Sequence, residues 1–258
     1  MITLSREVPI DPAHAALLIV DVQNYCAHPD GAGSHKLDAH QRHYLFASLR
    51  ETVLPNLRRL QSVCRRAHIE VVYAAVENMT GDGRDRSLDY KISGIDVPRG
   101  SWDARVLDEI APAEAEMIFR KTSSSVFIST NIDYVLRNLG VRSLIVAGMM
   151  TDQCVESAVR DACDLGYLVT LVSDACTTSG AERHRQSLIG IRGYCRQRST
   201  DALLRELAAD LPLMKPCAAV PAKRGTHLPA ARAIDSGPGL SPGKDAILSV
   251  VTSCLVSC

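Results

Sequence analysis

Residues 144–159 read LIVAGMMTDQCVESAV, and their pattern changes from an apolar run to helical spacing after Gly148. The residues before Gly148 favour a strand, and the apolar residues that follow Cys154 recur at intervals of three and four. Cys154 therefore falls in the first turn of the predicted helix, where unpaired N–H groups and the helix dipole favour a thiolate. Because a cysteine on a helix of small residues is more often a packing residue, this stretch alone makes Cys154 only a candidate nucleophile.

The same change from strand to helix recurs along the chain. Apolar runs typical of buried strands occupy residues 15–22, 69–76, 116–120, 144–148, 168–173 and 194–199. Helical spacing covers residues 44–66, 103–110, 131–138, 154–165, 181–192 and 201–209, and Pro55 forces a kink or a new first turn in the first of these. Strands that alternate with helices form right-handed βαβ units. We therefore expect an α/β fold with a doubly wound, mainly parallel six-stranded sheet and helices on both faces.

The composition is that of an ordinary globular protein. The chain has 258 residues, of which 46% are hydrophobic and 22% are charged, and its 29 basic residues balance 29 acidic ones. No basic stripe with interleaved aromatic residues suggests a nucleic-acid partner. No apolar stretch approaches the roughly 18 residues needed to cross a bilayer, and the first residues do not resemble a signal peptide. We therefore expect no membrane span and a cytoplasmic location.

The cysteines and histidines give no sign of a metal or a disulfide framework. The nine cysteines are scattered without a CxxC pair, and none of the eight histidines lies at the short spacing from a cysteine that a structural zinc site requires. We expect reduced thiols, no metal and no cofactor. Residues 1–211 form the predicted domain. Residues 212–258, rich in Pro, Ala, Gly and Lys, are predicted to be a tail of low order.

Three residues that can carry chemistry follow three different predicted strands. Asp21, Lys121 and Cys154 each fall at a carboxyl end, and ligands of parallel α/β sheets bind beyond these ends. Singly, Asp21 is either functional or a cap for the following turn, and Lys121 is either functional or a solvated charge. The polar segment 78–100 is too long for an ordinary connection, and such loops tend to carry function.

Three motifs in register resemble those of the isochorismatase-like cysteine hydrolases. They are DVQN at residues 21–24, RKTSSSVF at 120–127 and AGMMTDQCVES at 147–157, and the resemblance extends over roughly residues 12–205. It implies a catalytic triad of Asp21, Lys121 and Cys154. It also implies an oxyanion hole made by the backbone N–H groups of Met150 and Cys154, with a cis peptide bond between Met149 and Met150.

These residue types suit the hydrolysis of an amide. Cys154 would attack the carbonyl carbon, and Asp21 would take the thiol proton and pass it to the leaving amine. The ammonium of Lys121 would favour both the carboxylate and the thiolate. Water activated by Asp21 would then cleave the thioester. The predicted activity is therefore a metal-independent cysteine amidohydrolase that acts on a small amide or ureido compound and releases ammonia or an amine.

Four further residues are candidates for substrate binding. Glu77 and Trp102 either line the pocket or are a surface carboxylate and a packing aromatic. Phe127 would form a wall of the substrate site by resemblance, and Asn24 either binds substrate or shapes its loop.

Comparison with the subfamilies of these hydrolases limits the choice of activity. The segment ENMTGDGRDRS, residues 77–87, lacks the histidines that bind metal in nicotinamidases, so that activity is disfavoured. The strongest similarity is to ureidoacrylate and biuret amidohydrolases, although residues 82–95 differ from both. One alternative is a vinyl-ether hydrolase of the isochorismatase type, in which Asp21 is the acid and Cys154 is dispensable. The other is a scaffold without catalysis that binds a metabolite or partner. By family habit we expect a homo-oligomer.

Overall fold

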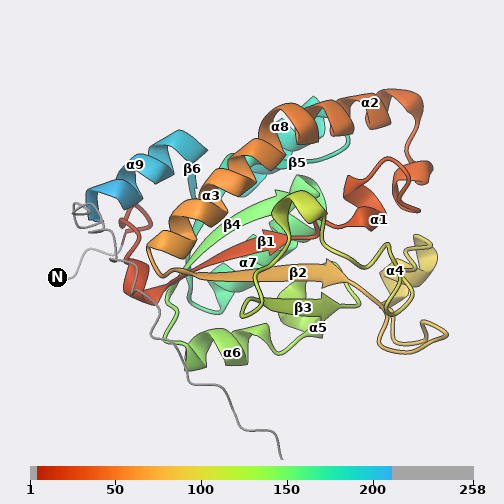
Figure 1. Ribbon diagram of the computed structural model, residues 1–258, viewed down its shortest axis with the longest axis horizontal. Coiled ribbons are helices and arrows are strands. Elements are labelled where there is room, and N and C mark those ends of the chain that lie inside the picture. Colours follow the sequence, from red (N-terminus) through yellow and green to blue (C-terminus); the bar gives the residue numbers. More distant parts are fainter. Residues whose placement is uncertain (1–4, 211–258) are drawn as a thin grey trace, which may run out of the picture. The chain divides into compact units, whose positions relative to one another are not determined.

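A six-stranded parallel sheet forms the centre of the protein. The computed structural model describes residues 5–210, and Figure 1 shows the strands in the order β3-β2-β1-β4-β5-β6. All the neighbouring strands in this part of the chain pair in parallel. The strands are β1 (Ala15–Val20), β2 (Glu70–Val76), β3 (Met117–Lys121), β4 (Ser143–Met149), β5 (Leu168–Thr177) and β6 (Arg196–Arg198). The predicted fold class is therefore confirmed.

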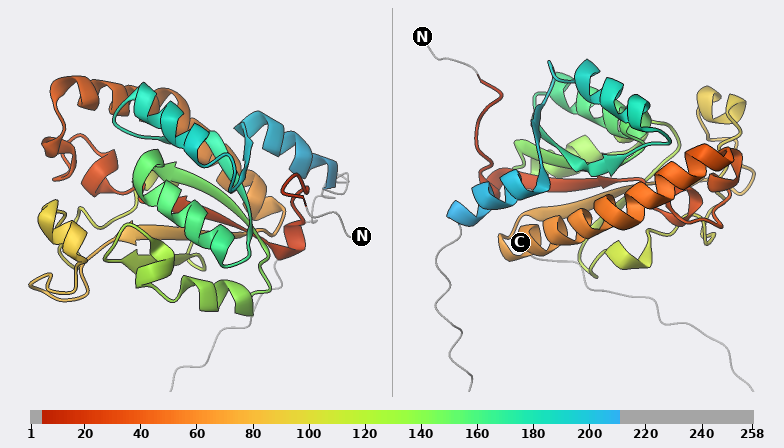
Figure 2. Two further views of the ribbon diagram at one scale, coloured as in Figure 1. Left: turned by 180° about the vertical axis from the view of Figure 1, so that it is seen from behind. Right: turned by 90° about the horizontal axis from the view of Figure 1, so that it is seen from above.

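Helices cover both faces of the sheet. Helices α3 (Leu54–Arg66) and α9 (Thr200–Asp210) lie on one face, and α7 (Glu156–Asp164) and α8 (Ala181–Gly190) lie on the other (Figure 2). Helix α5 (Val126–Ser129) packs against α7, where Ser125 at the start of α5 donates a hydrogen bond to Asp161, and α6 (Ile132–Asn138) packs against α5. This arrangement buries the strands on both sides, which explains their continuous apolar runs.

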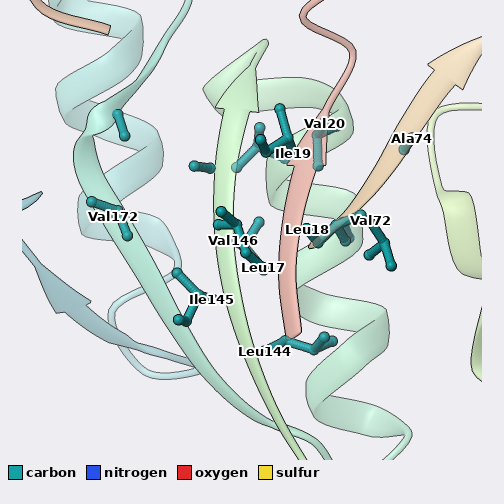
Figure 3. Close-up of a cluster of buried hydrophobic side chains, with 14 of the residues drawn as sticks. Leu17, Leu18, Ile19, Val20, Val72, Ala74, Leu144, Ile145, Val146 and Val172 are labelled. Carbon is teal, nitrogen blue, oxygen red and sulfur yellow. The ribbon is translucent and has the colours of Figure 1, made fainter. Parts of the chain in front are cut away.

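The two central strands, β1 and β4, are buried along their whole length. Side chains from β1 and β4 fill the space between the layers, including Leu17, Leu18, Leu144 and Ile145, which have no exposed surface (Figure 3). Each fully buried side chain of this size contributes about 1.5–3 kcal/mol. The two strands that carry Asp21 and Cys154 at their ends are therefore firmly packed.

The long helix predicted over residues 44–66 is interrupted where proline requires it. Helix α2 (Ala39–Ser48) continues through a five-residue π-helical segment, Leu49–Val53, into α3, and Pro55 lies in the first turn of α3. Proline lacks the N–H that a regular α-helix needs, so the backbone hydrogen bonds change from i→i+4 to i→i+5 spacing just before it. Of the two predicted alternatives, a kink or a new first turn, the structure shows the new first turn. The helix starts earlier than predicted, at a capping box between Asp38 and Gln41.

The helix predicted over residues 103–110 is wrong. The segment contains only a 3-10 turn, Asp108–Ile110, because its backbone pairs with the chain that follows β1. Asn24 donates a backbone hydrogen bond to the carbonyl of Arg105, and Leu107 donates one to Val22. Conversely, two short helices lie in segments predicted to be irregular, α1 (Asn24–Ala27) and α4 (Leu88–Ile92).

Close packing between β1 and β4 requires a glycine. A Cβ atom at Gly148 would lie 2.2 Å from the carbonyl oxygen of Val20, and Gly148 has a φ of 122°. Just beyond Val20, Asp21 has a φ of 53°, a left-handed conformation that non-glycine residues seldom adopt. Gly148 near the end of β4 and Asp21 just beyond β1 thus both have positive φ angles, at the edge of the sheet where the candidate residues meet.

The described helices, which belong to residues 5–210, include none of the length and apolar character that a bilayer crossing requires. The predicted tail, residues 212–258, lies outside the described residues.

Candidate active site

The three residues at the strand ends meet in space. Asp21 follows β1, Lys121 ends β3, and Cys154 lies in a π-helical turn, Thr151–Val155, that joins β4 to α7. Lys121 Nζ is 2.9 Å from Asp21 Oδ2 and 3.3 Å from Cys154 Sγ. Lys121 Nζ therefore contacts both the carboxylate and the sulfur, as the family resemblance implies.

Lys121 reaches this position from the edge of the sheet. Its strand is separated from β1 by β2, and its side chain is fully buried on the way to Asp21. Three oxygen atoms surround the ammonium: Asp21 Oδ2 at 2.9 Å, the Ser123 carbonyl at 2.9 Å and Tyr90 Oη at 3.0 Å. Cys154 Sγ, at 3.3 Å, is a fourth acceptor for the three N–H groups, and together these contacts fix the position of the ammonium.

Burial and charge set the protonation of the site. Burial raises the pKa of Asp21, and the neighbouring Lys121 opposes that rise. Burial alone lowers the pKa of Lys121, but the charges of Asp21 and Cys154 hold that pKa well above its usual value. Burial and the charge of Asp21 raise the pKa of the Cys154 thiol to about 12, and Lys121 offsets this only in part. Asp21 and Lys121 are thus in contact as a pair, and burial and the charge of Asp21 favour the protonated thiol of Cys154 beside them.

Lys121 favours the thiolate of Cys154, as expected from its charge, but burial and the charge of Asp21 outweigh it. The sequence places the favourable charges near the sulfur, but it does not show that the sulfur is buried against a carboxylate. Both of these features disfavour a second negative charge. Ionisation of Cys154 must therefore accompany transfer of its proton to a neighbouring base, and Asp21 Oδ1 has no hydrogen-bond partner among the described residues.

Backbone groups suited to bind an oxyanion lie beside the sulfur. The peptide bond between Met149 and Met150 is cis, as the family resemblance implies. Met150 and Cys154 both line one cavity, of about 440 Å³, together with Asp21. This volume lies within the range of pockets for small molecules.

The four residues proposed for substrate binding do not line this cavity. Asn24 donates a hydrogen bond to the Trp102 carbonyl, at 2.9 Å, and so shapes the loop. Trp102 packs edge-on against His28 outside the cavity. Glu77 pairs with Arg120, at 2.9 Å, and accepts a hydrogen bond from the Gly100 backbone. Phe127 packs against Tyr167, with ring centroids 6.0 Å apart.

Other side chains line the cavity instead. They include Tyr25, Lys36, Tyr90 and Arg183. Tyr90 belongs to α4, which lies within the polar segment predicted to carry function, but no motif singles it out. The one local signal is Ser87, whose side chain caps α4 by accepting a hydrogen bond from the Tyr90 N–H. A larger hollow of about 730 Å³ lies along β3, beside Met117 and Ile128, and contains none of the triad.

Potential metal ligands are dispersed. Within residues 5–210 no three His, Cys, Asp or Glu side chains are grouped as a metal site would require.

Comparison with known proteins gives a consistent family match. A family model described as the isochorismatase domain matches residues 15–202. The ureidoacrylate amidohydrolase RutB of Acinetobacter baylyi is 27% identical over 204 residues, which are 72% of this chain and 80% of that protein. The protein of the same name from Caulobacter segnis is 29% identical over 191 residues, 68% of this chain and 77% of its own length.

Solved structures share the fold. A cysteine hydrolase from Pseudomonas syringae pv. phaseolicola superimposes with a TM-score of 0.69 and 25% identity, and the match covers 79% of this chain and 96% of that one. N-carbamoylsarcosine amidase from Thermoplasma acidophilum has a TM-score of 0.59 and 23% identity, over 73% of this chain and 97% of that enzyme.

Proposed function

The chain belongs to the isochorismatase family, and from this membership and the buried triad we propose that it is a metal-independent cysteine amidohydrolase. Its substrate is a small amide or ureido compound in which it cleaves a carbon–nitrogen bond. The observation that carries the proposal is the position of Lys121 Nζ, 2.9 Å from the Asp21 carboxylate and 3.3 Å from Cys154 Sγ. This arrangement holds a base, a cation and a nucleophile in contact.

The first half of the reaction forms a thioester. Asp21 Oδ1 takes the thiol proton while Cys154 Sγ bonds to the carbonyl carbon, and the carbonyl π electrons move to oxygen. The N–H groups of Met150 and Cys154 bind that oxyanion. The electrons return as the carbon–nitrogen bond breaks, and the amine leaves with the proton from Asp21.

The second half releases the product. Asp21, again a carboxylate, takes a proton from water as the water oxygen bonds to the thioester carbon. The carbon–sulfur bond then breaks, and the sulfur recovers the proton from Asp21. The raised pKa of Cys154 suits this cycle, because the sulfur carries negative charge only while Asp21 holds its proton. Lys121 remains an ammonium throughout and stabilises whichever neighbour is charged.

The relatives guide the choice of substrate. Both curated relatives are ureidoacrylate amidohydrolases, and a cavity of about 440 Å³ accommodates a compound of that size. The proposal also includes a cytoplasmic homo-oligomer, whose mass light scattering would measure, and a domain boundary near residue 211, which limited proteolysis would map.

The test is ammonia release from a panel of ureido compounds, N-carbamoyl amino acids, biuret and simple amides. We expect turnover of at least one ureido compound, unchanged by a chelator. Asp21→Asn should lower kcat by about 10²- to 10⁴-fold with the fold intact, and Asp133→Asn on α6 is a matched control. Full ammonia release by Asp21→Asn would exclude Asp21 as the base, and loss of turnover with the chelator would exclude a metal-independent reaction.

A further inference from the structure

Tyr90 contacts the triad but is not one of its residues. Helix α4 carries it within the segment between β2 and β3, and the side chain is almost completely buried. It packs with Tyr25, Val76, Val97 and Ala104 in a small hydrophobic cluster that is separate from the main core. This cluster fixes the ring, so the phenol oxygen is held against the reacting groups rather than free to swing into solvent.

The hydrogen bonds around Lys121 limit where the Tyr90 proton can point. An ammonium can only donate, so Tyr90 Oη is the acceptor in its 3.0 Å contact with Lys121, which also contacts Cys154 Sγ at 3.3 Å. The proton of Tyr90 is therefore free to donate to a further group. Within residues 5–210 the remaining hydrogen-bond partner of Tyr90 Oη is Cys154 Sγ, at 3.8 Å, and either atom can be the donor in this contact.

The phenol is suited to remain a donor. Burial raises the pKa of Tyr90, the charge of Lys121 opposes that rise, and the nearby charges of Cys154 and Asp21 add to it, so the net shift keeps the proton on the phenol. A hydroxyl that accepts from an ammonium also becomes a stronger donor, because hydrogen bonds in a chain polarise one another.

We propose that Tyr90 is a further catalytic residue, whose hydroxyl donates a hydrogen bond to Cys154 Sγ and stabilises the thiolate as its proton passes to Asp21. Tyr90 keeps its own proton, so the only proton transferred is the one from sulfur to the carboxylate. The catalytic role of Tyr90 rests on the proposed function. The hydrogen bond itself can be tested without any substrate.

The test measures how fast iodoacetamide alkylates Cys154 between pH 7 and 10, with the Cys154 peptide quantified by mass spectrometry. The titratable groups around this sulfur are Asp21, Lys121 and Tyr90, with Cys26 close enough to couple to it. Loss of a hydrogen bond to a charged group should raise the pKa of Cys154 by about one unit or more. Tyr90→Phe should therefore slow alkylation about tenfold or more at every pH.

Tyr73→Phe is the control. It removes an equally buried hydroxyl, which bonds to Gln61 and Glu116 and does not line the cavity. Its rates should match those of the wild type. Equal rates for Tyr90→Phe and the wild type would overturn the proposal, as would equal slowing by both variants.

A second variant keeps the hydroxyl of residue 90 and changes its strength as a hydrogen-bond donor. Difluorotyrosine placed at position 90 is nearly the same size but a stronger donor, so it should speed alkylation of Cys154. Slower or unchanged alkylation would count against the hydrogen bond, even if Tyr90→Phe failed to fold. With an active substrate, Tyr90→Phe should lower kcat about 10- to 100-fold and change KM little. Failure to find a substrate would refute the proposed function without affecting the alkylation result.

Discussion

Replacing Lys121 with methionine should make the stability of the protein strongly dependent on pH. The side chains of Lys121 and Asp21 are 0% and 4% exposed, and their charged atoms are 2.9 Å apart. At an effective dielectric constant of about 20, this separation corresponds to an attraction of about 6 kcal/mol. Burying the two ions costs several kcal/mol each, so the intact pair contributes little net stability. Removal of one partner, however, leaves a buried charge uncompensated, at a cost of about 3–5 kcal/mol.

The direction of the pH effect follows from the pKa of Asp21. Burial raises this pKa and Lys121 lowers it, so Lys121→Met should raise it further. A carboxyl whose folded pKa lies above its unfolded value stabilises the fold only while it is protonated. Lys121→Met should therefore be close to wild-type stability near pH 4. It should lose about 3–5 kcal/mol as the pH rises from there through the folded pKa of Asp21.

The assay is urea denaturation at pH 5 and pH 8 for the wild type, both single variants and the double variant. Asp21→Asn combined with Lys121→Met removes both charges and should recover most of the stability lost at pH 8, giving an interaction energy of about 3 kcal/mol or more. Equal losses for Lys121→Met at the two pH values, together with additive effects in the double variant, would refute the buried pair.

Three further results are expected. Gly148→Ala should lower the free energy of unfolding by about 3 kcal/mol or more, because its Cβ would lie 2.2 Å from the Val20 carbonyl oxygen; an unchanged urea midpoint would contradict this. Glu77→Gln breaks the pair with Arg120 and should cost about 1 kcal/mol in thermal unfolding without changing KM, whereas a raised KM would place Glu77 on the substrate. In the wild type, alkylation of Cys154 should keep rising with pH up to pH 10, because burial and Asp21 raise its pKa to about 12, and a plateau near pH 7 would indicate a thiolate at rest.

The sequence predicts the sheet and the meeting of the triad for the same reason. Strands that are buried on both faces appear in the sequence as short continuous apolar runs, as in residues 15–20 and 143–149. Once the strands are parallel, the residues that follow them must share one edge. The strand ends therefore place Asp21, Lys121 and Cys154 at one edge of the sheet, and the family resemblance identifies them as a triad.

What the sequence does not predict depends on how loops fold over that edge. The segment between β2 and β3 brings Tyr90 to Lys121, and nothing in its polar composition fixes which side chain turns inward. The sequence gives Glu77 no evident partner. The pairing of β2 with β3 places Arg120 beside it. The protonation of Cys154 depends on burial, which periodicity near a helix start does not measure.

The central claim is that Cys154 is the nucleophile, and Cys154→Ala tests it most directly. The measurement is ammonia release from the best substrate of the panel, with folding checked by circular dichroism. Cys163→Ala, on the α7 helix that follows Cys154, is the control. The account predicts that Cys154→Ala loses turnover by about 10³-fold or more while Cys163→Ala keeps it. A folded Cys154→Ala variant that retains full turnover would contradict the account and favour a hydrolase in which Asp21 acts without the sulfur.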